Sequence, residues 1–546
     1  MTISLPRRMT VPAAVRRDWS AWAVGLGWLV QVAVRLCVFW PARGPAAYPD
    51  EAGYLLAARW LAGGPGGDLS HATLYRGGYP LLLSPVYWVT ADPATAYRLV
   101  VGIGALAGAV VFPLSVAILR RLDLPSPAAI TVGFAVSLLP ANGFFGAWAL
   151  ADAILPAVVA GWLLALIRFA DRGGYGAGTM ASLIAAYAYA VHSRGVVILL
   201  AQAGALCFLL IRGWTPRRRT LAAACALAIG YLAAKGLNAL ILRALYPGGA
   251  RDLGAILQAR LTSVDGLVRT LSGACGQVWY VVVATYGLAG LGLVAAAARA
   301  LSSRGDRAVR LVAAALVAGT AGIALASSAA LPDEHRVGNY AYGRYLACVG
   351  IPLALAGAAL LVRAGRRSMA HAALAAAALV VETTLAVTTY AGSRLEHYNF
   401  IGFDFPETSY LTSNPHSLDL YRASLVALLL GGCLVLVRRR PVLLGALLLS
   451  VNAGFVVWAA PTFVRPTLPA LPTGGGVEAA QGLDWRTTEE LSYRVGWTMI
   501  SRLPTTGPRR GTCIVVTAAG TLPGWRVVYR QPGRGTYWHR PQCRAS

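Results

Sequence analysis

The sequence predicts an α-helical polytopic membrane protein with a small α+β appendage at its C-terminal end. Of its 546 residues, 57% are hydrophobic and 13% are charged, whereas soluble domains carry roughly a quarter charged residues. The mean hydropathy is +0.58. The apolar residues form long runs, and arginines gather between these runs. Together these observations indicate a chain that crosses a membrane many times.

The transmembrane region begins at the first apolar run, 19–40. Arginines precede this run and no small-residue cleavage site follows it, so we expect an uncleaved first span after a cytoplasmic tail of residues 1–18. Further runs approach the ~20 residues that a transmembrane helix needs. They are 96–119, 127–147, 153–170, 176–193, 195–212, 220–245, 276–300, 311–330, 346–363, 371–391, 423–437 and 441–460. We therefore expect about thirteen transmembrane helices within residues 19–460.

Six arginine clusters determine the predicted orientation. They follow alternate spans and comprise Arg120–Arg121, Arg168 with Arg172, Arg217–Arg219, Arg304 with Arg307 and Arg310, Arg363 with Arg366–Arg367, and Arg438–Arg440. Basic residues between spans remain on the cytoplasmic side, which predicts an N-terminus inside and a C-terminus outside. The polar segments 41–95, 246–275, 331–345 and 392–422 then lie outside. Because the net charge of +26 comes from such clusters, we expect no nucleic-acid partner.

The first outer segment contains two stretches that are typical of helices at a membrane surface. One runs from Glu51 to Leu61. The other, 77–88, is too short to span a membrane and is rich in the aromatic residues found at membrane interfaces.

The tail, 461–546, has the composition of a small α+β appendage. A helix is expected near 487–501 and β-strands near 513–517 and 525–529. Cys513 and Cys543 share this tail and can form a disulfide if the tail is outside the cell. The eight cysteines show no Cys-x-x-Cys or Cys/His spacing, so we expect no zinc site.

Asp50 and Glu51 form an acidic pair just after the first span, at the start of the predicted surface helix. A carboxylate held there could act as a general base on an incoming hydroxyl. The alternative is structural: both carboxylates could favour the positive end of the helix, with Asp50 as its N-cap. The two roles are compatible.

Other polar side chains stand near the outer ends of spans, where such groups are costly and often functional. They are Asp152, His192, Arg194, Glu334, His335, Arg336 and Arg344, with His397 and Asp404 in a later outer segment. Asp152 could instead favour the dipole of its helix, and His192 with Arg194 could anchor a span at the headgroups. Lys235 and Glu382 lie within spans and are assigned no role.

The acidic pair, the Tyr-Pro-Leu-Leu-Leu stretch Tyr79–Leu83 and the acidic residue Asp152 opening a later span resemble features of the GT-C glycosyltransferases. This superfamily includes the lipid A aminoarabinose transferase, the protein O-mannosyltransferases and the mycobacterial arabinosyltransferases. The segment 343–345, Gly-Arg-Tyr, looks like the element that many members carry at the outer end of a late span. The resemblance covers residues 15–460 and implies a GT-C-like bundle in the cell membrane.

The resemblance implies a glycosyltransferase that takes a sugar from a polyprenyl-phosphate donor on the outer face. The sugar passes, with inversion, to a hydroxyl of a cell-envelope glycan, lipid or protein. Asp50 is then the expected base, with Glu51 supporting it or binding the acceptor, and Asp152 orienting the acceptor. The planar fork of arginine suits a leaving phosphate, so Arg344, and next Arg194, are expected to hold it. The other expected substrate-binding residues are His192, Tyr345, His335 and Tyr54.

A lipid-linked donor also agrees with the absence of a Gly-rich nucleotide loop from the sequence. We expect no cofactor; a divalent cation is possible, although no dense carboxylate cluster requires one. A transporter or flippase is the alternative, because charges within spans, such as Lys235 and Glu382, also mark transport pathways. No inverted repeat is evident, and the polar residues concentrate on one face, which favours the enzyme. A non-catalytic envelope scaffold is a third hypothesis, favoured only by the tail.

Overall fold

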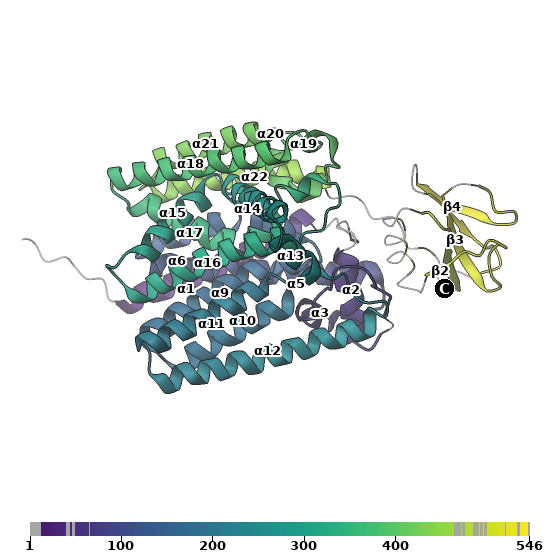
Figure 1. The fold of residues 1–546 in the computed structure, drawn as a ribbon, viewed down its shortest axis with the longest axis horizontal. Coiled ribbons are helices and arrows are strands. Elements are labelled where there is room, and N and C mark those ends of the chain that lie inside the picture. Colours follow the sequence, from purple (N-terminus) through teal and green to yellow (C-terminus); the bar gives the residue numbers. More distant parts are fainter. Residues whose placement is uncertain are drawn as a thin grey trace, which may run out of the picture.

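The chain forms a helical bundle with a small β-sheet beyond one end of it, as seen in a computed structural model (Figure 1). The structure describes residues 13–39, 44–45, 50–64, 66–463, 471, 475–483, 487, 491, 495, 500–518, 520–531 and 535–543. The helices of the first half are α1 (Ala13–Phe39), α2 (Asp50–Leu61), α3 (Gly78–Leu83), α4 (Val86–Val89), α5 (Pro93–Ala109), α6 (Val111–Arg121), α7 (Ser126–Ser137), α8 (Pro140–Gly143), α9 (Leu155–Arg172), α10 (Tyr175–Val191), α11 (Gly195–Arg212) and α12 (Arg217–Leu245).

The second half continues with α13 (Leu253–Leu261), α14 (Val264–Ala284), α15 (Leu288–Leu301), α16 (Arg307–Ala330), α17 (Ala347–Arg363), α18 (Arg366–Ala391), α19 (Arg394–His397), α20 (Pro406–Thr412), α21 (Leu420–Leu436) and α22 (Pro441–Phe463). Five short 3-10 helices join them: η1 (Phe145–Ala147), η2 (Ala151–Ala153), η3 (Val337–Asn339), η4 (Gly343–Leu346) and η5 (Gly402–Asp404). The strands are β1 (Gly476–Ala479), β2 (Ile500–Arg502), β3 (Thr512–Thr517), β4 (Arg526–Gln531) and β5 (Gly535–His539).

The six arginine clusters meet at one end of the bundle, which we call the basic end. Arg121 forms ion pairs there with Asp171 and, at 2.9 Å, with Asp306. Arg363 donates a 2.7 Å hydrogen bond to the carbonyl oxygen of Leu122. The other loops are joined by hydrogen bonds from Arg219 to Gly173 and from Arg439 to Ala364. The alternation of polar loops that the sequence predicts is therefore present in three dimensions.

Nine helices among the described residues are long and apolar enough to cross a membrane, or ten if a bent pair counts as one span. That pair joins Ser126–Ser137 to Pro140–Ala147 with a bend of 64°. The second helix of the pair starts at Pro140, because a proline ring clashes with the preceding turn and so interrupts a continuous helix. The remaining predicted runs form helices that are shorter or more charged. A membrane protein of many spans is confirmed, and the number thirteen stays a prediction.

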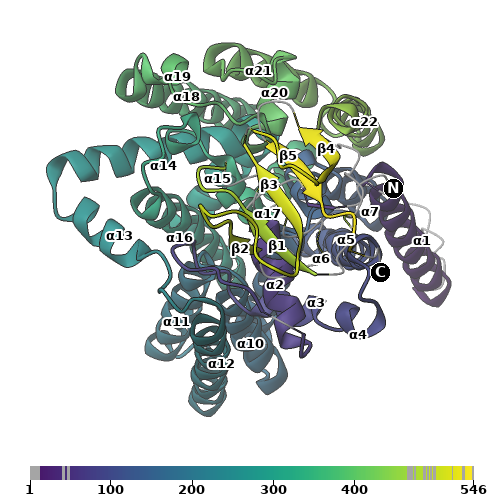
Figure 2. The same ribbon diagram turned by 90° about the vertical axis from the view of Figure 1, so that its right-hand side faces the viewer.

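The predicted span 276–300 is wrong in its extent, because two helices share it. α14 begins well before it and ends at Ala284, and α15 starts at Leu288. Between them Tyr286 and Gly287 have φ angles of 56° and 84°, a left-handed conformation that ends an α-helix. Figure 2 shows α14 lengthwise, whereas α10 and α12 are foreshortened. Hydropathy joins the two helices because the apolar composition continues through the break.

The first outer segment forms the predicted helices. α2 covers the expected 51–61 and buries Glu51 to Ala58. The stretch 77–88 folds as α3 and α4, which are interrupted around Ser84 and Pro85. At Gly78 a Cβ atom would lie 2.7 Å from the carbonyl carbon of Ala190, so only glycine allows α3 to pack this closely on α10.

The tail forms one five-stranded sheet in the order β2-β1-β3-β5-β4. β1 runs parallel to β2 and β3, whereas β5 is antiparallel to β3 and β4. The strands predicted near 513–517 and 525–529 are confirmed as β3 and β4. The helix predicted near 487–501 lies largely outside the described residues, and β2 takes its last two positions.

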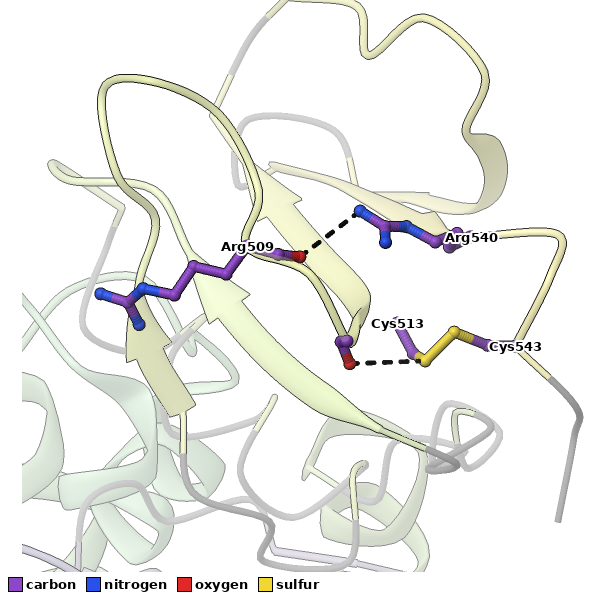
Figure 3. The surroundings of a disulfide bond; sticks show 5 residues. Arg509, Cys513, Arg540 and Cys543 are labelled. Atoms are coloured by element: carbon purple, nitrogen blue, oxygen red, sulfur yellow. Dashed lines mark hydrogen bonds between the residues drawn. A yellow bond between two sulfur atoms is a disulfide. The ribbon is translucent and has the colours of Figure 1, made fainter.

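Cys513 and Cys543 form the predicted disulfide, with their Cα atoms 5.8 Å apart. It ties the start of β3 to the segment that follows β5 (Figure 3). Nearby, Arg540 donates a hydrogen bond to the carbonyl oxygen of Arg509 at 3.5 Å (Figure 3). The bridge closes a loop with a sequence separation of 30, which typically stabilises a small fold by about 2–4 kcal/mol.

Candidate active site

Four segments bring polar side chains together at the end of the bundle opposite the basic end. They are the start of α2, the 3-10 helix η2, the link between α10 and α11, and the 3-10 helix η4. Figure 2 looks onto this end, with α2 near the centre and the sheet in front. The sequence places three of the four segments at the ends of spans, and the fold gathers them around one pocket.

A carboxylate–arginine chain of Asp50, Arg344, Asp152 and Arg194 links these segments. Arg344 donates from Nη1 to Asp50 Oδ2 at 2.7 Å and from Nε to Asp152 Oδ2 at 2.9 Å. Arg194 donates from Nη2 to Asp152 Oδ1 at 2.8 Å. Asp152, Arg194 and Arg344 are buried, whereas the Asp50 side chain is 35% exposed. Asp50 is thus the member of the chain that a substrate can reach.

Asp152 holds the two buried arginines in place. Burial alone would raise the pKa of this carboxyl, but the charges of Arg194 and Arg344 outweigh burial and hold the pKa below its usual range. The carboxylate is therefore ionised, and both of its oxygens accept hydrogen bonds from guanidinium groups. Its side chain does not cap α9, whose N-cap residue is Ile154, and the alternative that Asp152 favours the dipole of its helix stays a prediction.

His192 and Tyr345 position Arg194. The Nδ1 atom of His192 accepts hydrogen bonds from the backbone N and from Nε of Arg194, both at 3.2 Å. Burial, and next the charge of Arg194, lower the pKa of His192 well below its usual value, so the ring is neutral. The Arg194 guanidinium lies 5.0 Å from the centre of the Tyr345 ring and donates to the carbonyl oxygen of Arg344 at 3.2 Å.

Glu51 points away from Asp50 and into the protein. Its side chain is fully buried, and Oε1 accepts hydrogen bonds from the Tyr97 hydroxyl at 2.6 Å and from the Ala149 backbone N at 2.7 Å. These contacts fasten the first turn of α2 to α5 and to the segment before η2. The acidic pair therefore divides into one carboxylate at the pocket and one in the core.

The pocket beside the carboxylate–arginine chain has a volume of about 100 Å³. It includes most of the residues that the sequence indicates: Asp50, Tyr54, His192, Arg194, Arg344 and Tyr345. Tyr54 packs edge-on against the rings of Tyr75 and Tyr79, with centroids 5.2 and 5.4 Å away. His335 is not brought to this pocket, because it is exposed and packs on Tyr398 with ring centroids 5.3 Å apart.

Arg76 also lines the pocket, and it is not among the residues that the sequence indicates. It donates to the Tyr189 carbonyl oxygen at 2.7 Å and lies 4.2 Å from the centre of that ring. Among the described residues it forms no ion pair. Asn238 Oδ1 accepts from the Gly77 backbone N at 2.9 Å and holds the segment. Arg76 stands just before α3, in the same outer segment as Asp50, and this position is the signal that could have indicated Arg76.

Two buried carboxyl groups lie behind η4. Burial raises the pKa of Asp404 to about 6, although Arg336 partly opposes this shift. Burial raises the pKa of Glu407 to about 7, partly offset by a 2.6 Å hydrogen bond from the Tyr280 hydroxyl. A Cβ atom at Gly343 would overlap the Tyr280 ring. Glu407 and Tyr280 thus form the floor on which the Gly-Arg-Tyr segment rests.

A second buried polar cluster lies within the described spans, where the Arg35 guanidinium donates to Gln31 Oε1 at 2.6 Å and to the Ser137 carbonyl oxygen at 2.9 Å. Lys235 and Glu382 lie on the exposed surfaces of α12 and α18, and they form no ion pair with each other. Within the described part of the chain, no three His, Cys, Asp or Glu side chains are grouped to hold a metal ion.

No protein-family model matches the chain, and no curated protein sequence matches it. Solved structures do resemble this chain. ArnT from Cupriavidus metallidurans bound to undecaprenyl phosphate is 16% identical and has a TM-score of 0.55, with 94% of this chain and 98% of that chain covered. The apo form of the same protein has a TM-score of 0.54 at 16% identity and the same coverage. The oligosaccharyltransferase AglB from Archaeoglobus fulgidus is 11% identical, with a TM-score of 0.44, 92% of this chain and 69% of that chain covered.

At this level of identity the comparisons concern the fold. The likeness to ArnT extends over nearly the whole of both chains, so it includes the tail as well as the bundle. The chain therefore has the fold of the GT-C glycosyltransferases.

Proposed function

We propose that this protein is a glycosyltransferase that moves a sugar from a polyprenyl-phosphate donor to an acceptor hydroxyl at the outer face of the cell membrane. The acceptor is a cell-envelope glycan, lipid or protein. The observation that carries the proposal is the pocket in which a partly exposed Asp50 faces three arginines. The GT-C fold supports it, as does the undecaprenyl phosphate bound by ArnT.

Asp50 is the general base. One carboxylate oxygen accepts from Arg344, and the other is 3.3 Å from the Tyr75 hydroxyl, so the group is oriented from both sides while its edge remains accessible. In the reaction the acceptor oxygen forms a bond to the anomeric carbon as its proton passes to Asp50. The bond from that carbon to the phosphate oxygen breaks, and the electron pair stays on the lipid phosphate. A single displacement of this kind inverts the anomeric centre.

The donor phosphate binds to the positive charge that the pocket carries in excess. Arg194 and Arg344 are already balanced by Asp152 and Asp50, which leaves Arg76 as the uncompensated charge. A sugar linked through a phosphodiester carries one negative charge, so Arg76 matches it. The leaving phosphate gains a second charge, and Arg344 can supply a further donor by turning from Asp50.

These arginines supply the positive charge that a divalent cation provides in other phosphoryl-leaving-group sites. The proposal therefore requires no cofactor. Purified enzyme should keep its activity after extensive treatment with a chelator, and full loss that Mg²⁺ or Mn²⁺ restores would contradict this part of the proposal.

Transfer from a synthetic radiolabelled polyprenyl-phosphate sugar tests the function. Proteoliposomes with the protein are supplied with donor and with envelope extract as acceptor, and the anomeric configuration of the product is determined. We expect Asp50→Asn to lower transfer by a factor of about 10²–10⁴ while donor binding is retained. Asp68→Asn is the matched control, because Asp68 is an exposed carboxylate in the same outer segment. Equal transfer by wild type and Asp50→Asn would refute the assignment, and lipid movement without transfer would favour a flippase.

A further inference from the structure

A second cavity lies between α11 and α16, toward the basic end and away from the candidate active site. Its volume is about 610 Å³, within the range of roughly 300–1,000 Å³ typical of ligand pockets. Its walls are almost entirely apolar and include Ala201, Gly204 and Ala205 of α11 and Ala314 and Ala315 of α16. The proposed glycosyltransferase reaction makes no use of it.

The two helices touch at their outer halves and separate toward the basic end. A Cβ atom at Gly319 would lie 3.9 Å from Ile198, and one at Gly322 would lie 2.7 Å from Val197, so α11 packs directly against α16 there. Farther along, a Cβ atom at Gly204 would meet nothing within 4 Å. Small side chains thus keep a wedge-shaped groove open where larger ones would fill it.

Three arginines surround the wide end of the groove. Arg212 lies 5.7 Å from the centre of the Phe208 ring, and Arg307 lies 5.6 Å from the Trp214 ring. Arg310 donates to the Ser303 carbonyl oxygen at 3.1 Å, and its buried Nε atom has no hydrogen-bond partner. None of these arginines forms an ion pair among the described residues. The neighbouring Asp306 is paired with Arg121.

The groove is long enough to hold one acyl chain. Its lining on α11 extends from Val197 to Arg212, roughly 22 Å at 1.5 Å per residue. That is most of the length of α11, which is itself long enough to cross a membrane. An acyl chain therefore fits along the groove with its phosphate at the arginines, whereas a long isoprenoid chain would extend beyond it.

We propose that this groove binds an anionic phospholipid of the leaflet at the basic end. One acyl chain lies between α11 and α16, and the lipid phosphate contacts Arg212 and Arg310, with Arg307 nearby. Basic pockets between transmembrane helices recognise such headgroups because the phosphate offers several acceptors to the guanidinium forks. The site is independent of the proposed enzymatic function.

Delipidated full-length protein in detergent tests the proposal by native mass spectrometry and by thermal unfolding. Phosphatidylglycerol, diphosphatidylglycerol, phosphatidylcholine with the same chains, and polyprenyl phosphate are added separately. We expect the two anionic phospholipids to bind at least tenfold more tightly than phosphatidylcholine and to raise Tm by several degrees. Equal binding of phosphatidylcholine, or binding of polyprenyl phosphate that Gly204→Leu abolishes, would overturn the proposal.

Two kinds of variant separate the headgroup contact from the groove. Arg212→Gln combined with Arg310→Gln should remove the preference for anionic lipid, and Gly204→Leu should fill the groove and lower binding at least fivefold. The matched controls are Arg366→Gln with Arg367→Gln, also at the basic end, and Gly236→Leu, at which a Cβ atom likewise meets nothing within 4 Å. Loss of lipid binding in the controls, or full binding in both test variants, would refute the site.

Discussion

At the scale of single residues, the carboxylate–arginine chain gives each of its members a partner, and only Asp50 is open to solvent. Two buried arginines and one buried carboxylate would be costly if unpaired, because desolvation exceeds the gain from a single poor contact. Here Arg344 bridges Asp50 and Asp152, with donor–acceptor distances of 2.7 and 2.9 Å. This bridge requires the shape of a guanidinium group as well as its charge.

Arg344→Lys and Arg344→Ala test this requirement. A lysine can pair with only one of the two carboxylates, and alanine leaves Asp50 without its partner. Each charged hydrogen bond contributes on the order of 1.5–3 kcal/mol, so we expect alanine to lower the transfer rate at least tenfold and lysine somewhat less. If the Arg344→Lys variant is fully active and the Arg344→Ala variant merely gives less protein in the membrane, Arg344 is a headgroup anchor.

Arg76→Gln tests the assignment of the uncompensated charge. The change removes a cation without breaking an ion pair, so we expect Tm to change little and the Kd for the donor to rise about 10–100-fold, on the scale of charged hydrogen bonds. Isothermal titration with a non-transferable donor analogue measures it. Arg251→Gln, at an exposed arginine paired with Glu334, is the control. Unchanged donor affinity would shift the phosphate site to Arg344 and Arg194.

Glu407 gives the folded protein an unusual dependence on pH. Its folded pKa of about 7 is above its unfolded value, so the native state binds the extra proton and stability falls as the pH rises from about 4.5 to 7. We expect the Tm of wild type to decrease over this interval relative to Glu407→Gln, whose side chain does not titrate. Glu396→Gln, on an exposed residue of α19, should behave as wild type. Parallel curves for wild type and Glu407→Gln would contradict this account.

The sequence predicts that Asp50, Asp152, Arg194 and Arg344 share the outer end, because the positions of the basic clusters assign the loops to sides. It does not predict which atoms pair. Successive residues on a helix point about 100° apart, with 3.6 residues per turn, so Glu51 enters the core while Asp50 faces the pocket. Only the contacts with Tyr97 and the Ala149 backbone reveal this difference.

At the scale of elements, glycine sets how closely the site segments approach their supports. Gly343 lets η4 lie directly on the Tyr280 ring, which the hydrogen bond to Glu407 holds in place. The first residue of the Gly-Arg-Tyr segment must therefore be small, because any side chain at position 343 would overlap the Tyr280 ring. The break between α14 and α15 could not be found from hydropathy, since it depends on two backbone conformations at Tyr286 and Gly287 and not on polarity.

Gly343→Ala should displace η4 and thus the Arg344 guanidinium. Overpacking of this kind typically costs about 1–3 kcal/mol, and a shift of about 1 Å in a reacting group can cost about 10²-fold in rate. We expect normal membrane insertion with transfer lowered at least tenfold. Gly365→Ala is the control, because a Cβ atom there meets nothing within 4 Å. Equal activity of the two variants would show that the Tyr280 ring yields to the added methyl group.

At the scale of the whole molecule, the separation of a basic end from a pocket-bearing end is what the sequence predicts best. The predicted orientation depends on many arginines and apolar residues together, so an error in one helix boundary does not change it. The sheet is predicted less well. β1 and β2 contain four and three residues, too few to show a period of two, and their parallel pairing joins segments distant in sequence.

Labelling of the two termini tests the orientation. Thr2→Cys and Ser546→Cys are made separately in a protein whose six free cysteines, Cys37, Cys207, Cys225, Cys275, Cys348 and Cys433, are replaced by alanine. A membrane-impermeant maleimide should label position 546 on intact cells and position 2 only after permeabilisation. Labelling of both positions from the same side would refute an odd number of spans.

The carboxylate–arginine chain has a consequence for biosynthesis. Asp152 and Arg194 are 42 residues apart, so they can neutralise each other early during insertion. Asp50 can pair only after Arg344 has been synthesised, 294 residues later. At synthesis rates of roughly 5–20 residues per second this delay is about 15–60 s. A nascent chain that stops before η4 would hold Asp50 and Asp152 without the arginine that bridges them. The pocket can therefore assemble only after α16 has been synthesised, whereas α17 to α22 follow η4 in the chain.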